Sequence, residues 1–191
     1  ESWSDNWPAV RLNRALLGCV RAVPEFADWN SIEVMRFLYS WMDPRETRKV
    51  LKIAPGRDAK FWGDCLRNSY ICVGWDEVGD LSEFENEDAF RESFEGHYLQ
   101  SDYNGNRSKC TEKAREIWSL TDLEPGDIIV ANRGTSHVLA LGEVIEPGYE
   151  WYPERQEHKH IVHVKWDTSY AKEIPEQRRW ALKTVLKVPS E

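Results

Sequence analysis

A Pro-Gly pair at positions 55 and 56 separates two short apolar runs, and it constrains the fold more than any other feature of the sequence. Proline fixes φ at about −65° and glycine accepts positive φ, so the pair indicates a turn. The flanking runs, Val50 to Ile53 and Tyr70 to Val73, are rich in residues that favour strands. Between them, Asp58 can cap a helix over residues 59–66. The stretch therefore predicts a strand, a turn, a short helix and a second strand.

The second predicted strand ends in the loop Gly74-Trp75-Asp76-Glu77. Binding residues often lie on loops that follow strands, because a rigid scaffold positions them there. A tryptophan at such a point either packs into the core, as most tryptophans do, or presents a flat apolar face to a ligand. The chain contains ten tryptophans, so most of them must serve the core.

Several motifs follow one another in a fixed order along the chain. Ile53-Ala54-Pro55-Gly56 is followed by Ala59 and Trp62, and residues 71–81 have the pattern I-x-V-G-W-D-E-x-G-D-L. Further motifs are PGDIIVANRG at residues 125–134, LGEV at residues 141–144 and VKW at residues 164–166. Together they resemble the EVE domains of the PUA-like superfamily, in particular those at the N-terminus of McrB-type GTPase subunits of modification-dependent restriction systems. The resemblance covers residues 50–187 and leaves the first fifty unexplained.

The resemblance implies a pocket that holds one flipped, modified base in an aromatic cage. Trp75 matches the strand-end tryptophan of the family, and Asp76 beside it would accept a hydrogen bond from an exocyclic amine. The expected base-binding residues are Trp75, Asp76, Trp62, Trp118, Asn132, Gly134 and Ser136. The expected contacts with the DNA backbone are Arg133, Arg57, Lys60, Thr135, His137, Trp151 and Tyr152. For Trp62 and Trp118, packing in the core is an equally good interpretation.

The resemblance also implies the wider role. The chain would be the non-catalytic specificity module of a prokaryotic, cytoplasmic restriction complex, and it would recognise 5-methylcytosine or a related modified cytosine in DNA by base flipping. Its partners would be a GTPase motor domain C-terminal to this segment and a separate nuclease subunit. The chain begins Glu1-Ser2 without a methionine, so we expect it to be a piece of a longer protein. We expect no cofactor, and the sequence contains no nucleophile elbow and no Gly-rich phosphate loop.

Net charge is the main objection to a nucleic-acid ligand, because contacts with phosphates dominate such affinities. The chain carries 25 basic and 33 acidic residues, which gives a formal net charge of −8. Residues 53–125 hold eight of the basic and sixteen of the acidic residues, so they account for the whole excess. The two flanking parts of the chain are close to neutral, and they can present a local basic face.

Other kinds of site find little support. His158, His160 and His163 lie close together, but alternation along a strand puts His163 on the face opposite the first two, so we expect no metal site. The four cysteines form no C-x-x-C motif, which argues against zinc and against a disulfide framework. No apolar run is long enough for a membrane span, and no signal-peptide pattern occurs.

The remaining periodicity predicts an α+β fold. Helical spacing places Phe90, Phe94 and Tyr98 on one face of a helix over residues 87–98, and a second helix is expected over residues 108–120. The further strands are expected over residues 128–131, 137–145, 160–166 and 180–188. A curled mixed β-sheet or a small open barrel with surrounding helices fits this order, and it agrees with the PUA-like fold that the resemblance implies. We expect residues 1–49 to form an N-terminal helical extension and residues 50–191 to form the EVE domain.

Two alternatives to a reader of modified cytosine stay open. The same fold can bind N6-methyladenine in DNA, or modified RNA, because an aromatic cage accepts any flat base. A protein–protein docking domain is the second alternative, with the N-terminal helices and exposed tryptophans as its interface. Salt-dependent affinity for DNA would distinguish the readers from the docking domain.

Overall fold

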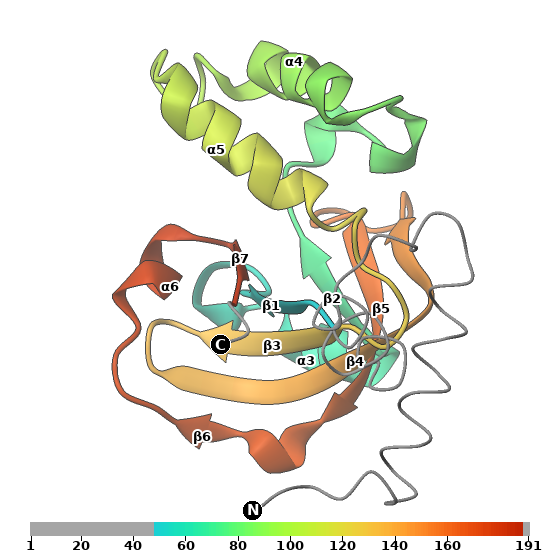
Figure 1. Cartoon of the computed structure of the whole chain (residues 1–191), viewed down its shortest axis with the longest axis vertical. Coiled ribbons are helices and arrows are strands. Elements are labelled where there is room, and N and C mark those ends of the chain that lie inside the picture. The colour runs from blue at the N-terminus through green and yellow to red at the C-terminus, as the bar shows by residue number, and fades with distance from the viewer. Residues whose placement is uncertain (1–47, 189–191) are drawn as a thin grey trace, which may run out of the picture. The chain divides into compact units, whose positions relative to one another are not determined.

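A computed structural model describes residues 48–188, so the helical extension expected over residues 1–49 lies almost wholly outside the described residues. The described part combines a seven-stranded mixed sheet with helices, which confirms the expected α+β class (Figure 1). Within residues 48–188, no helix is both long and apolar enough to cross a membrane.

Strands and helices follow one another in an order that resembles the predicted one. The strands are β1 (Val50–Ile53), β2 (Tyr70–Val73), β3 (Ile128–Arg133), β4 (His137–Trp151), β5 (His160–Asp167), β6 (Lys172–Glu173) and β7 (Val185–Lys187). The α-helices are α3 (Trp62–Asn68), α4 (Glu87–Tyr98), α5 (Arg107–Trp118) and α6 (Arg178–Leu182). Four short 3-10 helices complete the list: η3 (Arg57–Ala59), η4 (Asp76–Val78), η5 (Leu81–Glu83) and η6 (Thr168–Tyr170).

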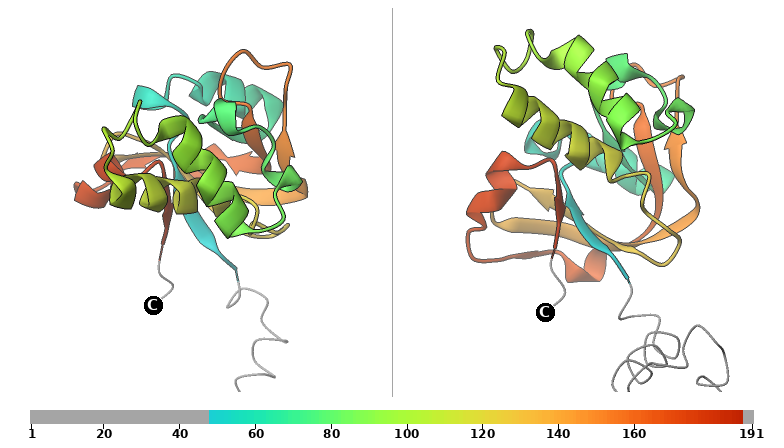
Figure 2. Two further views of the ribbon diagram at one scale, coloured as in Figure 1. Left: turned by 90° about the horizontal axis from the view of Figure 1, so that it is seen from above. Right: turned by 45° about the horizontal axis from the view of Figure 1, so that its top comes forward.

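The sheet is mostly antiparallel and has the strand order β2-β5-β4-β3-β1-β7, with β6 paired to β4. The exception is the parallel pair of β1 and β3. The long strand β4 changes register against β5 between Val144 and Tyr149, and such an irregularity bends a strand and increases its twist. The sheet is therefore curled, as the three views show (Figures 1 and 2).

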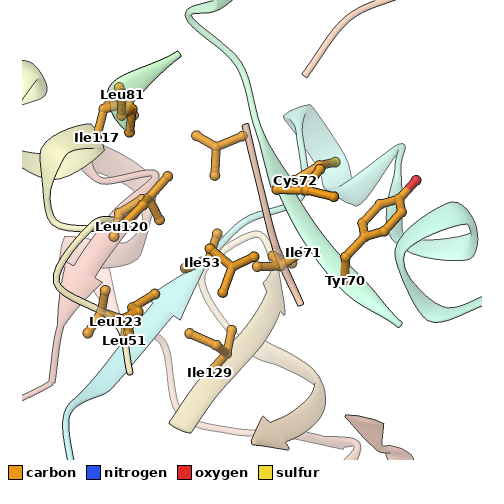
Figure 3. Packing of buried hydrophobic residues seen from close by; sticks show 14 of the residues in the cluster. Leu51, Ile53, Tyr70, Ile71, Cys72, Leu81, Ile117, Leu120, Leu123 and Ile129 are labelled. Atoms are coloured by element: carbon orange, nitrogen blue, oxygen red, sulfur yellow. The ribbon is translucent and has the colours of Figure 1, made fainter. Parts of the chain in front are cut away.

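The core lies between the curled sheet and the helices. Ile53 of β1, Ile71 of β2 and Ile129 of β3 are fully buried in one cluster, which Leu120 joins from the segment after α5 (Figure 3). Each fully buried aliphatic side chain stabilises the fold by about 1.5–3 kcal/mol relative to an exposed one. This cluster fixes the ends of β1 and β3, which matter for the site described below.

The helical pair α4 and α5 confirms two predictions. Phe90, Phe94 and Tyr98 are the buried residues of α4, as the helical spacing predicted. Each helix begins at an asparagine whose side chain accepts a backbone N–H, from Ala89 at 2.9 Å and from Lys109 at 3.1 Å. α5 lies between α4 and the sheet (Figure 1).

Two local predictions are wrong. Residues 180–188 do not form one strand, because β1 is only four residues long and offers partners to Val185–Lys187 alone. The preceding residues instead form the short helix α6. Asp58 does not cap the helix after the Pro-Gly turn, because it lies inside η3 with φ 52°, and α3 begins after Phe61.

Candidate functional site

A cavity of about 380 Å³ lies where β1 and β3 end and β7 begins. Because β1 and β3 are parallel, with Ile53 opposite Ala131, their carboxyl ends lie side by side. β7 runs antiparallel to β1 and begins at the same edge, and the N–H of Ala54 donates to the carbonyl of Thr184 at 3.1 Å. Ligands often bind outside the carboxyl ends of parallel strands, and small-molecule pockets measure about 300–1,000 Å³.

The lining residues come from five separate segments of the chain. They belong to the turn after β1, the end of β2, the β3–β4 turn, the loop before β5 and the segment around α6. The lining residues are Ala54, Gly56, Arg57, Asp58, Ala59, Trp75, Asn132, Gly134, Thr135, His158, Trp180, Leu182, Lys183 and Thr184. Two tryptophans and several small or aliphatic residues thus surround a few polar groups.

Trp75 forms one aromatic wall, and neighbouring polar groups hold its backbone. The buried His160 ring contacts the Trp75 carbonyl through Nε2 at 3.3 Å, while its Nδ1 contacts the hydroxyl of Tyr149 at 3.0 Å. Burial lowers the pKa of His160, so this ring is neutral near pH 7. The carboxylate of Asp76 accepts the backbone N–H groups of His158 and Lys159 at 2.8 and 2.7 Å. Asp76 therefore positions the loop before β5, a role that the sequence did not predict.

Strained backbone is concentrated around this cavity. Six residues other than glycine have positive φ among the described residues, and four of them line the cavity: Asp58, Ala59, Trp75 and His158. Positive φ costs a non-glycine residue about 1–2 kcal/mol, and an aromatic residue adopts it rarely. Such strain persists only where the surrounding structure enforces it, and it clusters at functional sites.

Asn132 contributes a buried polar atom without a partner. The side chain is 1% exposed, and its Nδ2 donates to the carbonyl of Gly134 at 2.7 Å. That bond fixes the orientation of the amide, so Oδ1 is the remaining acceptor. Among the described residues, Oδ1 is the one buried side-chain nitrogen or oxygen that lacks a hydrogen bond. An unpaired buried acceptor costs about 1–3 kcal/mol, so it calls for an explanation.

Trp180 forms a second aromatic wall that the sequence analysis missed. It lies in α6, and Leu182, Lys183 and Thr184 after it also line the cavity. Nothing in the local sequence distinguishes Trp180 from the other tryptophans, since the contacts that place it come from β1 and α5. His158 was missed for a similar reason, because its position depends on the Asp76 carboxylate 82 residues away in the chain.

The structure brings together some of the predicted base-binding residues and separates others. Trp75, Asn132 and Gly134 line the same cavity. Ser136 does not line it, and its hydroxyl lies 3.2 Å from Nδ1 of His137. Trp62 packs edge-on against Trp166 with ring centroids 5.0 Å apart, and Trp118 stacks on Phe90 at 5.4 Å. Neither of these two tryptophans lines the cavity.

Of the residues predicted to contact the DNA backbone, some line the cavity and others do not. Arg57 and Thr135 line the cavity, and Arg133 is exposed at the end of β3. Lys60 pairs with Glu157 at 3.1 Å. Trp151 lies 4.8 Å from the His160 ring, and Tyr152 belongs to a different pocket beside Arg155 and His163.

No metal site appears among residues 48–188, in keeping with the histidine contacts. His160 contacts Trp75 and Tyr149, whereas His163 pairs with Glu150 at 2.5 Å. His158 lines the cavity, and its ring lies 4.2 Å from that of Phe61. Burial lowers the pKa of His158, so it offers the cavity a neutral ring.

Comparison with known proteins yields a family without a described activity. A family model described as "Domain of unknown function (DUF8426)" matches residues 51–188, which is well over half of the chain. No curated protein matches the sequence.

Proposed function

We propose that this chain, which belongs to the family described as "Domain of unknown function (DUF8426)", uses the cavity at the ends of β1 and β3 to hold one modified base flipped out of DNA. The base is 5-methylcytosine or a related modified cytosine. The module itself is non-catalytic, and it directs a modification-dependent restriction complex to modified DNA. The curled mixed sheet and the order of its motifs support a PUA-like fold of the EVE type.

The unpaired Oδ1 of Asn132 carries the proposal. A ligand that satisfies this atom must bring an N–H or O–H donor, and the two tryptophan walls favour a flat ring. Cytosine and adenine combine a flat ring with an exocyclic amine. The strained backbone at Trp75 and His158 supports the same conclusion, because strain of this kind accumulates where a ligand is held.

The energies constrain the mode of binding. Flipping a base out of the stack costs a few kcal/mol, and stacking on an aromatic side chain returns about 1–3 kcal/mol per base. A hydrogen bond to Asn132 adds about 0.5–1.5 kcal/mol. The base alone therefore roughly offsets the cost of flipping, and the net affinity comes from phosphate contacts such as Arg57 and Arg133 at the rim. Binding should weaken as salt rises.

Selectivity for the methyl group needs more than apolar burial. Burying one methyl contributes about 0.8 kcal/mol, which is only a several-fold preference. Larger selectivity requires that the unmodified base leaves a void, or that several modules bind together. An assembly through a C-terminal GTPase motor, with a separate nuclease subunit, would supply such multivalency.

The test is a titration of the chain with labelled duplexes at two salt concentrations. The duplexes carry cytosine, 5-methylcytosine, 5-hydroxymethylcytosine, N4-methylcytosine or N6-methyladenine at one position, and a matched RNA set is included. We expect one modified cytosine duplex to bind best, with an affinity that falls by about fivefold or more in Asn132→Leu and in Trp75→Ala. Trp62→Phe is the matched control, since Trp62 packs outside the cavity.

The other outcomes have definite meanings. A preference for N6-methyladenine or for modified RNA would support the cavity as the binding site and would show that its ligand is not a modified cytosine in DNA. Equal binding to all duplexes, or loss of affinity in the Trp62→Phe control alone, would rule out the base cavity. No binding to any nucleic acid would favour the docking domain.

A further inference from the structure

The segment that carries Trp180 cannot hold its own conformation. Helix α6 is five residues long, whereas isolated helices shorter than about 12–15 residues are marginal in water. The last carbonyls of any helix have no partners within it, and the residues after α6 reach strand β7 only at Val185. Groups from elsewhere must therefore position the Trp180 wall.

A buried cation satisfies the carbonyls of this segment. The side chain of Lys52, in β1, has no exposed surface. Its Nζ donates to the carbonyl of Trp180 at 3.2 Å and to the carbonyl of Lys183. A positive charge at the C-terminal end of a helix also suits the helix dipole. Lys52 thus serves as a C-cap that comes from a distant strand.

A buried anion satisfies the amides that follow. Oε2 of Glu116, on α5, accepts the N–H of Thr184 at 3.1 Å and that of Val185 at 3.4 Å. Glu116 is in turn paired with Lys113 at 2.5 Å and with Lys183 at 3.0 Å. The carbonyls of Trp180 and Lys183 therefore contact a cation, and the amides of the next two residues contact an anion.

Lys113, which pairs with Glu116, also contacts Trp75, the other aromatic wall. Nζ of Lys113 lies 5.1 Å from the centroid of the Trp75 ring, within the range of a cation–π contact. Glu116 therefore contacts the Trp180 segment through two amides and Trp75 through Lys113. Buried ion pairs rarely add net stability over apolar side chains of similar size, so a positional role explains their presence better than stability does.

We infer that Lys52 and Glu116 are positioning residues that set the placement of the Trp180 wall relative to Trp75. The inference rests on the proposed function for its ligand, but its geometry is independent of that function. If the wall is ordered for only part of the time, the apparent affinity falls by the same fraction. We call the contacts of Lys52 and Glu116 with the Trp180 segment the charge clamp. Loss of the clamp should weaken binding without altering the shape of the folded core.

The experiment compares Lys52→Met and Glu116→Gln with Phe94→Leu, a core change in α4 that leaves the clamp intact. Hydrogen exchange of the full chain reports residues 178–187, and duplex titration reports affinity. We expect exchange in that segment to rise about tenfold in Lys52→Met while α4 and α5 stay protected, and affinity to fall by a similar factor. Glu116→Gln keeps an acceptor oxygen, so its effect should be smaller.

The outcomes separate the clamp from the proposed function. Exchange that rises no more in residues 178–187 than in the Phe94→Leu control would overturn the inference. Faster local exchange, together with a wild-type chain that binds no base, would leave the clamp standing and refute the proposed function. If Lys52→Met does not fold, Glu116→Gln alone decides, because it removes a charge and leaves the side-chain shape unchanged.

Discussion

Trp75 and Trp180 line the same cavity, yet the chain holds them by different means. Trp75 lies two residues after the end of β2, has φ 70°, and is fixed through its backbone by the neutral ring of His160. Trp180 lies in ordinary helical backbone, and buried charges from β1 and α5 hold its segment. The backbone of the Trp75 wall is therefore strained and held by a neutral group, whereas buried charges hold the backbone of the Trp180 wall.

Because they are held by different means, the two walls should respond to different changes. Strain at one residue is relieved or increased by substitution at that residue, whereas a charge clamp responds to pH and to changes in remote residues.

Removing each tryptophan tests whether both walls contact the ligand. Trp75→Ala and Trp180→Ala should each lower the affinity for the preferred duplex by about 5- to 150-fold, which corresponds to a stacking energy of about 1–3 kcal/mol. Duplex titration at constant salt measures both, with Trp62→Phe as the control. Unchanged affinity in Trp180→Ala would show that the cavity has only one aromatic wall.

The pH dependence of stability tests the charge clamp. Burial lowers the pKa of Lys52 from 10.5 to about 8, while Glu116 acts to raise it and Lys113 to lower it. Between these pH values the unfolded state binds a proton that the folded state has lost, so this group increases the free energy of unfolding as pH rises. The gain should be on the order of 1–3 kcal/mol, and it should be absent from Lys52→Met.

Urea unfolding at several pH values between 7 and 10 measures this difference. Burial raises the pKa values of Tyr98 and Tyr103 to about 12. Both tyrosines are present in the wild type and in Lys52→Met, so their contributions cancel in the difference between the two unfolding free energies. Parallel curves for the wild type and Lys52→Met would contradict the role of Lys52. No comparable difference from the wild type is expected for Trp75→Ala, since that variant keeps Lys52 and its buried surroundings.

The glycine variant should be more stable than the alanine variant at one wall and less stable at the other. At Trp75, glycine accepts φ 70° without strain, so Trp75→Gly should be about 1 kcal/mol more stable than Trp75→Ala. At Trp180, in helical backbone, Trp180→Gly should be about 1 kcal/mol less stable than Trp180→Ala. Thermal or urea unfolding of the four variants gives both differences. The same sign at both positions would mean that backbone strain does not distinguish the walls.

The contrast also explains what the sequence could predict. The β2 end with Trp75 and the β3 end with Asn132 follow short apolar runs, and local punctuation places them. Helix α4 was predictable because its buried face repeats at helical spacing. The position of Trp180 was not predictable, because its partner Lys52 lies 128 residues away in the chain. In addition, residues 180–188 were expected to form a strand, whereas the first of them belong to the short helix α6.

Trp62 and Trp118 illustrate the reverse problem. Both were equally good candidates for core packing and for the cavity, because composition says nothing about which tryptophans converge. The structure packs them against Trp166 and Phe90 instead. The left-handed backbone at Trp75 and His158 could not be predicted from the sequence either, since it results from tertiary contacts rather than from residue preference.

Lys113 gives the sharpest test of whether the two walls are connected. Its Nζ lies near the Trp75 ring and pairs with Glu116, which holds the Trp180 segment. Lys113→Met keeps the apolar stem and removes a cation–π contact of about 0.5–2 kcal/mol, so affinity should fall about two- to thirtyfold. Exchange in residues 178–187 should rise slightly as well, because Glu116 loses one partner. If affinity falls and this exchange does not change, Lys113 acts on Trp75 alone, and the two walls are positioned independently.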